Sequence, residues 1–405
     1  MKKLYIAIND LLVYGSAITR PTGIQRVASG LSSALADQHG AEVVTVSGAS
    51  MRRASIPHAK KQTLFARIAE PALLLLAHTP RRFQEEFRKV ARTLLSGLAS
   101  RSGGEVISPQ VGDWIAVLGA PWIAPGMAEA VLAIKRQEGV RVALLVHDLL
   151  PATSPQWFSD AQGESAKHDV EMLIEKADLL CAVSTEVVTE LLERYGKEAF
   201  LLMPADPELQ SSGSPSFASN NGDRIVLCVG TLHPRKNLLA LVKIWEDWAQ
   251  RSAAGVGDLS AVPLLYLVGR RHPQDGELFK ALTDHPRAAS RIRLIHDADD
   301  AKLASLYSAC RFLVMPSLAE GWGLPIREAL ISGRPAIATD AVPAASGSKF
   351  VRVVPAGDDD QLARAIIEWW ESDIPEQMNR EIIKHFIPRR WPQVADELGV
   401  LLNAE

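Results

Sequence analysis

Short apolar runs separated by amphipathic stretches recur along the whole chain. The runs occupy residues 4–8, 114–119, 140–147, 179–183, 225–229, 264–268, 292–295, 312–315, 336–338 and 351–354. Continuous apolar runs of this length, bounded by polar turns, predict parallel strands that are buried on both faces. The stretches between them carry apolar residues at helical spacing, for example residues 24–38 and 129–138. The pattern therefore predicts repeated strand–helix units and an α/β fold.

The length of the chain and one polar segment predict two domains. A chain of 405 residues is too long for a single ordinary core. Residues 205–222 are rich in Ser, Pro, Gly and Asn, a composition that cannot build a core and is typical of a linker. We therefore expect a first domain over residues 1–204, a second over 223–385, and a separate last segment, 386–405, with a helix starting at Trp391.

A basic segment of about residues 51–105 interrupts the first domain. Residues 51–101 hold eleven Lys and Arg against three acidic residues, and their apolar positions follow helical spacing broken near Pro71 and Pro80. One interpretation is a set of cationic amphipathic helices that bind an anionic membrane surface. The other is a helical layer that covers the first sheet and keeps its charges in water.

Composition excludes several classes of function. The net charge of −3 offers no general surface for nucleic acid. The three cysteines, Cys181, Cys228 and Cys310, lie in or beside apolar runs without metal-type spacing, which is typical of buried reduced thiols in a cytosolic protein. Residues 9–23 are interpreted as a long polar connection without a dinucleotide fingerprint, which argues against an NAD-linked enzyme.

No signal peptide, membrane span or metal site is expected. The N-terminal apolar run is too short for a signal peptide and is interpreted as a strand, and no run approaches the length that spans a bilayer. The acidic residues 358–360 precede a predicted helix, so we expect them to cap it, and the same applies to Asp297, Asp299 and Asp300. No His or Cys cluster has the spacing of metal ligands.

The most informative stretch is residues 317–331. It follows the apolar run at 312–315, and Pro325 suits the first turn of the helix that comes next. Gly321 and Gly323 leave backbone N–H groups free at the positive end of that helix, which favours an anion such as phosphate. Glu320 and Glu328 flank this loop, either as capping residues or as acceptors for sugar or ribose hydroxyls.

A second motif lies about ninety residues earlier. The apolar run at 225–229 leads into Gly230 and Thr231, and then into the adjacent cations Arg235 and Lys236 at the start of the next helix. Cations oppose the helix dipole at such a place. Their position is favourable if they face a diphosphate, which Arg binds as a fork and Lys as a point charge.

Four motifs together resemble one enzyme family. The segments are TGIQRV at 22–27, HDLLP at 147–151, GTLHPRKN at 230–237 and EGWGLPIRE at 320–328. In this order they resemble the retaining nucleotide-sugar glycosyltransferases of family four, and most of all the bacterial mannosyl- and rhamnosyltransferases of surface-polysaccharide assembly. The resemblance implies a GT-B fold, with two Rossmann-like domains facing each other across a cleft and the last helix crossing back to the first domain.

The resemblance also implies roles for individual residues. The catalytic residues would be Glu320, His147, Lys236 and Arg235. The donor nucleotide and sugar would contact Gly23, Thr231, Arg235, Lys236, Arg270, Ile295, His296, Gly321, Trp322, Gly323, Leu324 and Glu328. The acceptor would contact Arg26 and Asp148. From the residues alone, Arg26 and Arg270 are equally surface cations, and Gly23 and His147 are equally ordinary turn residues. The chain departs from the family at Thr231, where many members have Arg, and at His233, where the polysaccharide branch often has Glu.

The implied reaction moves a sugar from a nucleoside diphosphate sugar to an acceptor hydroxyl with retention at the anomeric carbon and without a metal or cofactor. By analogy the donor is GDP-mannose, and the alternatives are a UDP- or dTDP-sugar. The acceptor would be a glycan or polyprenyl-linked glycan, and the enzyme would work in the cytoplasm or at the inner face of the cytoplasmic membrane. Two rival classes are a noncatalytic sugar-nucleotide-binding or scaffold protein and an epimerase or phosphorylase of the same fold.

Overall fold

The computed structural model divides the chain into two compact units. It describes residues 2–17, 22–56, 104–158, 160–207, 225–256, 259, 261–272 and 274–404. Unit 1 comprises Met1–Ala205 together with Arg389–Glu405, and unit 2 comprises Asp206–Pro388. Most of the predicted linker and of the predicted basic insertion lie outside the described residues.

Unit 1 is built on a sheet whose central strands are parallel. Its strands are β1 (Leu4–Ala7), β2 (Glu42–Ser47), β3 (Ser50–Arg53), β4 (Val106–Ile107), β5 (Trp114–Val117), β6 (Arg141–Val146), β7 (Leu179–Ala182) and β8 (Phe200–Leu201). They lie in the order β4-β3-β2-β1-β5-β6-β7-β8, with β3 antiparallel to both neighbours. The order reverses direction between β1 and β5, as in Rossmann-like sheets.

Helices follow the strands of unit 1. They are α1 (Asn9–Ala17), α2 (Gly23–His39), α5 (Met127–Glu138), α6 (Leu150–Thr153), α7 (Asp160–Lys176), α8 (Thr185–Tyr195) and α16 (Trp391–Ala404), with short 3-10 turns at Pro121–Ile123 and Pro155–Trp157. Ser184 caps α8, because its side chain accepts a hydrogen bond from the backbone N–H of Val187.

Two sequence interpretations of unit 1 are wrong. Residues 9–17 form helix α1 rather than a polar connection, because Leu11 and Val13 bury their side chains in the core. Residues 51–53 belong to strand β3 rather than to basic helices. In that strand, Met51 is buried and Arg53 pairs with Glu42. Apolar and polar residues therefore alternate, as is typical of a strand near the edge of a sheet.

Unit 2 has a fully parallel six-stranded sheet. Its strands are β9 (Ile225–Val229), β10 (Leu264–Val268), β11 (Ile292–Ile295), β12 (Cys310–Met315), β13 (Ala336–Thr339) and β14 (Val351–Val354). The order is β11-β10-β9-β12-β13-β14, which is the doubly wound order with its switch point between β9 and β12. All six predicted strands are confirmed. The central strands β9, β12 and β13 are almost wholly buried, whereas the outer strands β11 and β14 have exposed positions.

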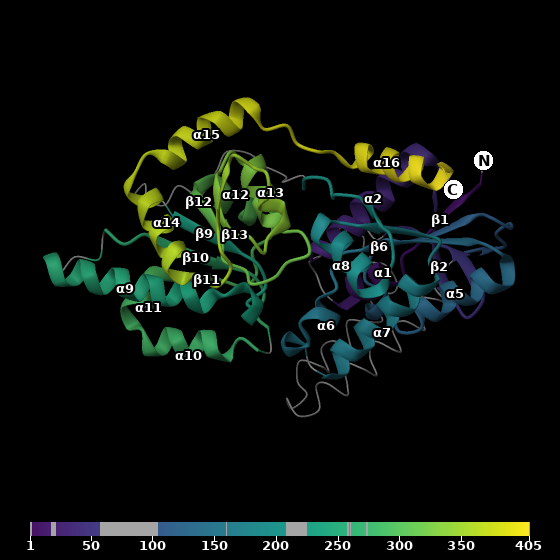
Figure 1. Ribbon diagram of the computed structural model, residues 1–405, viewed down its shortest axis with the longest axis horizontal. Helices are drawn as coiled ribbons and strands as arrows, with labels where there is room; N and C mark the ends of the chain where they lie inside the picture. The colour runs from purple at the N-terminus through teal and green to yellow at the C-terminus, as the bar shows by residue number, and fades with distance from the viewer. Residues whose placement is uncertain are drawn as a thin grey trace. The chain divides into compact units, whose positions relative to one another are not determined.

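Helices cover both faces of this sheet (Figure 1). They are α9 (Leu238–Val256), α10 (Gly276–Asp284), α11 (Pro286–Arg291), α12 (Asp300–Ala309), α13 (Leu324–Ile331), α14 (Asp359–Glu371) and α15 (Ile374–His385), with 3-10 turns at Pro234–Lys236 and Pro343–Ala345. One core lies under α9, α10, α11 and α14 and takes Val226 and Cys228 from β9. The other lies under α12, α13 and α15 and takes Ile225 and Leu227. The alternation follows the two-residue period of a strand.

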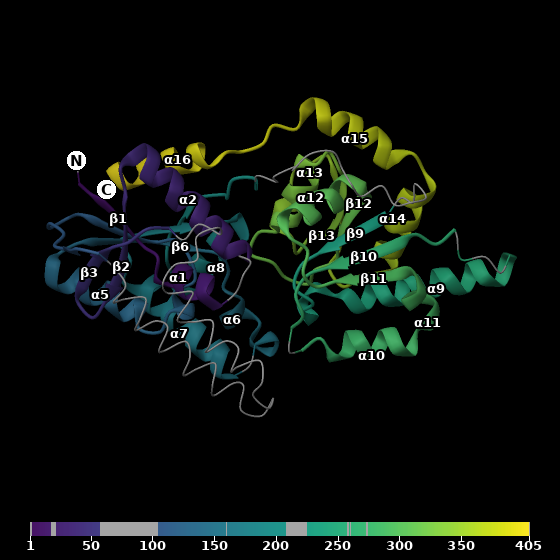
Figure 2. The same ribbon diagram turned by 180° about the vertical axis from the view of Figure 1, so that it is seen from behind.

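The last helix, α16, packs on unit 1 after the chain has passed through unit 2. It lies along α2 in both views (Figures 1 and 2). The indole of Trp391 covers Gly30 so closely that any Cβ there would clash with it. The indole N–H of Trp114 donates to the carbonyl of Leu402 at 3.1 Å. The close packing against Gly30 and the hydrogen bond from Trp114 join the two ends of the helix to unit 1.

Candidate functional site

The charged residues predicted for the donor site collect at the switch point of the unit 2 sheet. Parallel strands end at one edge, and the loops after the two central strands diverge there to leave room for a ligand. The loop after β9 carries Arg235 and Lys236, and the loop after β12 carries Glu320. Two segments that lie 84 residues apart in sequence therefore meet at this edge.

Glu320 forms ion pairs with both cations. Its Oε2 lies 2.8 Å from Nη1 of Arg235, and its Oε1 pairs with Nζ of Lys236. The hydroxyl of Ser317 also donates to Oε1, at 2.7 Å. The side chain of Glu320 is only 8% exposed and that of Lys236 only 10%. Two cations and one carboxylate thus form a buried cluster with a net positive charge, which we call the Arg235–Glu320–Lys236 cluster.

The electrostatics of this cluster keep Glu320 ionised. Burial by itself would raise the pKa of Glu320, but the charges of Arg235 and Lys236 and their hydrogen bonds outweigh it and lower the pKa to about 2. Burial lowers the pKa of Lys236, and the adjacent charge of Arg235 acts in the same direction, whereas Glu320 opposes both. An anion placed here would gain from a positive charge that is shielded from water.

Backbone contacts hold the two loops in place. The guanidinium of Arg235 donates to the carbonyl of Ala319 at 2.9 Å, and the N–H of Leu318 donates to the carbonyl of Arg235 at 2.7 Å. The cations lie in a 3-10 turn before α9 rather than in the helix itself. Nδ1 of His233 accepts from the N–H of Arg235 and so caps this turn. The departure from the family at His233 therefore has a structural role.

Glycines shape the loops on either side of the cluster. Gly323 has φ of 110°, and a Cβ there would lie 2.5 Å from a methyl of Val342, so only glycine fits before α13. A side chain at Gly269 would collide with the carbonyl of Gly230, because the loops after β9 and β10 touch. In that contact the N–H of Leu232 donates to the carbonyl of Arg270 at 2.9 Å, beside Thr231.

Helix α13 places Glu328 inside unit 2. Glu328 is 3% exposed, and its Oε2 accepts a hydrogen bond from the hydroxyl of Tyr307 on α12 at 2.6 Å. Tyr307 was not predicted, because nothing in its spacing links α12 to the loop motif. Pro325 lies in the first turn of α13, as expected. A contact of Glu328 with ribose stays a prediction.

The remaining predicted donor residues surround the same loops. Leu324 begins α13 and is buried, and the carbonyl of Trp322 accepts from the N–H of Ala344 at 2.9 Å. Gly321 is also buried in this loop. Ile295 ends β11, where its carbonyl accepts from the N–H of Gly269 at 2.9 Å.

A histidine also reaches the carbonyl of Gly269. A ring nitrogen of His296, Nδ1, lies 3.3 Å from that oxygen. His296 immediately follows Ile295 at the end of β11. Both residues therefore lie at the carboxyl edge of the sheet, and their contact with a nucleobase stays a prediction.

In unit 1 a corresponding set of polar residues follows the central strands. His147 comes directly after β6, is 7% exposed and places Nε2 2.8 Å from the carbonyl of Leu118 after β5. Burial lowers its pKa to about 4, so the ring is neutral at pH 7 and donates from Nε2, which leaves Nδ1 as an acceptor. Oδ1 of Asp148 accepts from the N–H of Leu150 at 3.2 Å and steadies the turn.

Asp10 of α1 is a buried acid at this edge that was not predicted from the sequence. It is 1% exposed, and its Oδ2 accepts from the N–H of Ala120 at 2.8 Å. Burial raises its pKa to about 6 despite these backbone hydrogen bonds. The misassignment of residues 9–17 as a loop hid this position.

The other residues predicted for unit 1 lie at the start of α2. Gly23 is its first residue, after the N-cap Thr22, and the N–H of Arg26 donates to the carbonyl of Thr22 at 3.0 Å. Gly23 is exposed and Arg26 partly so. Their contacts with donor and acceptor stay predictions.

Two of the acidic residues that were expected to cap helices do so, Asp358 before α14 and Asp299 before α12. Asp358 accepts at 2.9 Å from the N–H of Gln361, and Asp299 accepts at 2.6 Å from the N–H of Lys302. The three cysteines are buried and unpaired by disulfides, and burial raises the pKa of each thiol to about 12. Of the helices that the structure describes, none is long and apolar enough to cross a membrane.

Comparison with known proteins agrees with this architecture. Residues 223–372 match the family described as Glycosyl transferases group 1. These residues form a glycosyltransferase group 1 domain of the family-four type, as the sequence motifs suggested. Sucrose-phosphate synthase from Thermosynechococcus elongatus aligns over 100% of this chain and 99% of its own with a TM-score of 0.64 and 19% identity. An Escherichia coli structure titled trehalose-6-phosphate, bound with UDP-2-fluoro glucose, aligns over 99% of this chain and 98% of its own with a TM-score of 0.62 and 13% identity. The predicted GT-B fold class is confirmed.

Curated relatives are more specific but distant. The serotype-specific mannosyltransferase WbdA of Escherichia coli is 25% identical over 228 residues, which are 51% of this chain. The chain spans about a quarter of that relative, since the match covers 26% of its length. The O-antigen chain mannosyltransferase B of Escherichia coli is 23% identical over 245 residues, covering 58% of this chain and 62% of the relative.

Proposed function

We propose that the protein is a retaining glycosyltransferase that moves mannose from GDP-mannose to a glycan hydroxyl in the synthesis of a bacterial surface polysaccharide. The observation that carries the proposal is the Arg235–Glu320–Lys236 cluster at the switch point of a glycosyltransferase group 1 domain. The names of the curated relatives, which are mannosyltransferases of O-antigen synthesis, support the sugar. A UDP-sugar is the second candidate, because solved structures of the same fold hold UDP or UDP-glucose.

The cluster suits the departure of a nucleoside diphosphate. In the transfer, the bond between the anomeric carbon and the diphosphate oxygen breaks, and the acceptor oxygen bonds to that carbon from the same face. The acceptor proton passes to the departing diphosphate oxygen. Negative charge grows on the diphosphate, and Arg235 and Lys236 stabilise it from a buried position, where such charges act strongly. Glu320 then exchanges part of its contact with the two cations for hydroxyls of the donor sugar.

Other residues support this arrangement. The N–H groups of the loop at Gly321 and Gly323 and the start of α13 add positive potential beside the diphosphate. Neutral His147 offers an unprotonated Nδ1 to a sugar hydroxyl. We place the acceptor contacts at Arg26 and Asp148 and the ribose contact at Glu328. The acceptor is a glycan or a polyprenyl-linked glycan, and the reaction takes place on the cytoplasmic side of the membrane, without a metal at the donor.

The donor base is tested by thermal denaturation with GDP, UDP or dTDP. We expect GDP to raise the melting temperature, because a ligand at one hundred times its Kd adds about 2.7 kcal/mol of stability. Lys236→Ala should remove the shift. Lys243→Ala is the matched control, since Lys243 is exposed on α9. A rise with UDP or dTDP and none with GDP would move the assignment to the second candidate.

Turnover separates an enzyme from a noncatalytic binding protein. With GDP-mannose and a mannan oligosaccharide acceptor, NMR of the product should show an α linkage, which is retention. Glu320→Ala should lower the rate by more than about tenfold, the loss expected when a contact made in the transition state is removed. A smaller loss, with GDP binding intact, would favour the noncatalytic alternative.

A further inference from the structure

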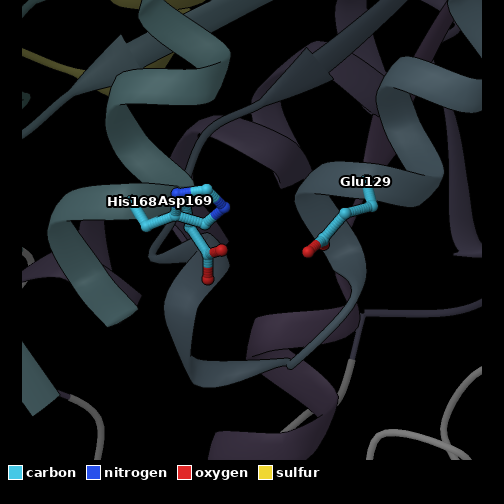
Figure 3. Close-up of side chains that lie close together, drawn as sticks. All are labelled: Glu129, His168 and Asp169. Atoms are coloured by element: carbon cyan, nitrogen blue, oxygen red, sulfur yellow. The ribbon is translucent and has the colours of Figure 1, made fainter. Parts of the chain in front are cut away.

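A cluster of three metal-ligand side chains lies in unit 1, between two helices. Glu129 is in the first turn of α5, and His168 and Asp169 are neighbours on α7. One potential ligand atom from each residue lies within 4.8 Å of the other two. Figure 3 shows the carboxylates of Asp169 and Glu129 pointing toward one another, with the imidazole of His168 beside them. Spacing along the chain does not indicate this group, because Glu129 lies about forty residues before His168 and Asp169.

Asp169 is the member that points to a ligand. It is 7% exposed, yet no side chain or N–H group of the described residues donates a hydrogen bond to its carboxylate. A buried carboxylate without a partner is costly, and here a second carboxylate faces it. A cation between the carboxylates of Asp169 and Glu129 would offset both the cost of burying Asp169 and its repulsion by Glu129.

We propose that Glu129, His168 and Asp169 bind one divalent transition-metal ion that joins α5 to α7. Bonds of about 2.0–2.2 Å hold the ligand atoms of such an ion roughly 3–4.4 Å apart. Small movements of the three side chains would therefore bring their ligand atoms into bonding positions. One imidazole nitrogen with two carboxylate oxygens suits Zn²⁺ or Mn²⁺, whereas Mg²⁺ prefers oxygen ligands alone. Glu129 and His168 are exposed, so the ion can enter from water and keep water as its further ligand. The site is independent of the proposed sugar transfer.

Binding is measured by calorimetry on the full chain after treatment with EDTA and dialysis, without a histidine tag. We expect one equivalent of Zn²⁺ or Mn²⁺ to bind saturably and to raise the melting temperature, and Mg²⁺ to bind at least tenfold more weakly. His168→Gln and Glu129→Gln should each weaken binding at least tenfold. Both side chains are exposed, so the variants should fold, which circular dichroism checks.

The matched control is Glu164→Gln, an exposed acid on α7 outside the cluster, which should bind the metal like the unmodified chain. Co²⁺ gives a second readout, since its visible absorption reports nitrogen ligation and should be lost in His168→Gln. The proposal is overturned if no stoichiometric binding occurs, or if both cluster variants bind as tightly as the control.

Discussion

The buried charges of the Arg235–Glu320–Lys236 cluster predict a pH-dependent contribution to stability. The pKa of Glu320 falls from 4.5 to about 2 on folding. At about 1.4 kcal/mol per pKa unit, the ionised carboxylate stabilises the folded state by about 3 kcal/mol. Because the folded pKa is the lower one, this contribution is complete above pH 4.5 and is lost as the pH falls toward 2.

Glu320→Gln removes that contribution and leaves two cations close together. We expect the variant to lose about 3 kcal/mol of unfolding free energy at pH 7. The difference from the unmodified chain should shrink as the pH is lowered from 5 to 2, since protonation then removes the same charge from Glu320 itself. Urea denaturation at a series of pH values, followed by circular dichroism, measures the difference. Glu277→Gln, at an exposed position of α10, is the control and should show little difference at any pH.

A second arm of the experiment uses the nucleotide. Saturating diphosphate supplies negative charge to Arg235 and Lys236, so it should recover part of the stability lost in Glu320→Gln. If the loss at pH 7 equals the loss at pH 3, or if it is below about 1 kcal/mol, Glu320 is not the charge that the two cations stabilise, and the electrostatic reasoning fails.

Three further substitutions test contacts elsewhere. Arg327→Ala should lower the unfolding free energy by about 3–5 kcal/mol, measured by urea denaturation, because Arg327 forms a bidentate pair with Asp206, whose side chain is 1% exposed. A loss under about 1 kcal/mol would contradict the pairing. Gly30→Val should detach α16 and lower the unfolding free energy by about 1–3 kcal/mol, because the new side chain would clash with Trp391. Hydrogen exchange in α16 should then become faster, and unchanged exchange would refute the close packing. Tyr307→Phe should weaken GDP binding several-fold by freeing Glu328 from its hydroxyl donor, and equal affinity would exclude this support.

The sequence predicted the parts of the fold that depend on continuous burial. Strand β9 is apolar at every position, and β12 is apolar from Phe312 to Met315, because helices cover both faces of the sheet there. Such runs can be recognised in a single sequence. The loop motifs could be placed for the same reason, since each directly follows such a strand. Glu320 and Lys236 lie in two such loops, and they pair at the carboxyl edge of the sheet.

Features that depend on contacts between distant helices could not be predicted. Helix α1 begins with Asn9 and Asp10, which are buried together with Leu11 and Val13, and polar residues of this kind were interpreted as part of a loop. The bond between Tyr307 and Glu328 and the cluster of Glu129 with α7 depend on how helices pack, which spacing along the chain does not encode. A pattern of hydrophobic and polar residues assigns polar residues to the surface, so it cannot predict which of them are buried.

The path of the chain makes unit 2 an insertion into unit 1. The backbone leaves unit 1 after Ala205 and rejoins it at Arg389, so residues 206–388 form one contiguous piece that carries its own sheet and both cores. A gene fragment encoding only that piece could be produced as an autonomous unit on which the proposed binding of nucleotides is screened. The rest of unit 1 cannot be shortened in the same way, because a fragment ending at Ala205 would lack α16 and would expose the face of α2 on which α16 packs, which favours aggregation.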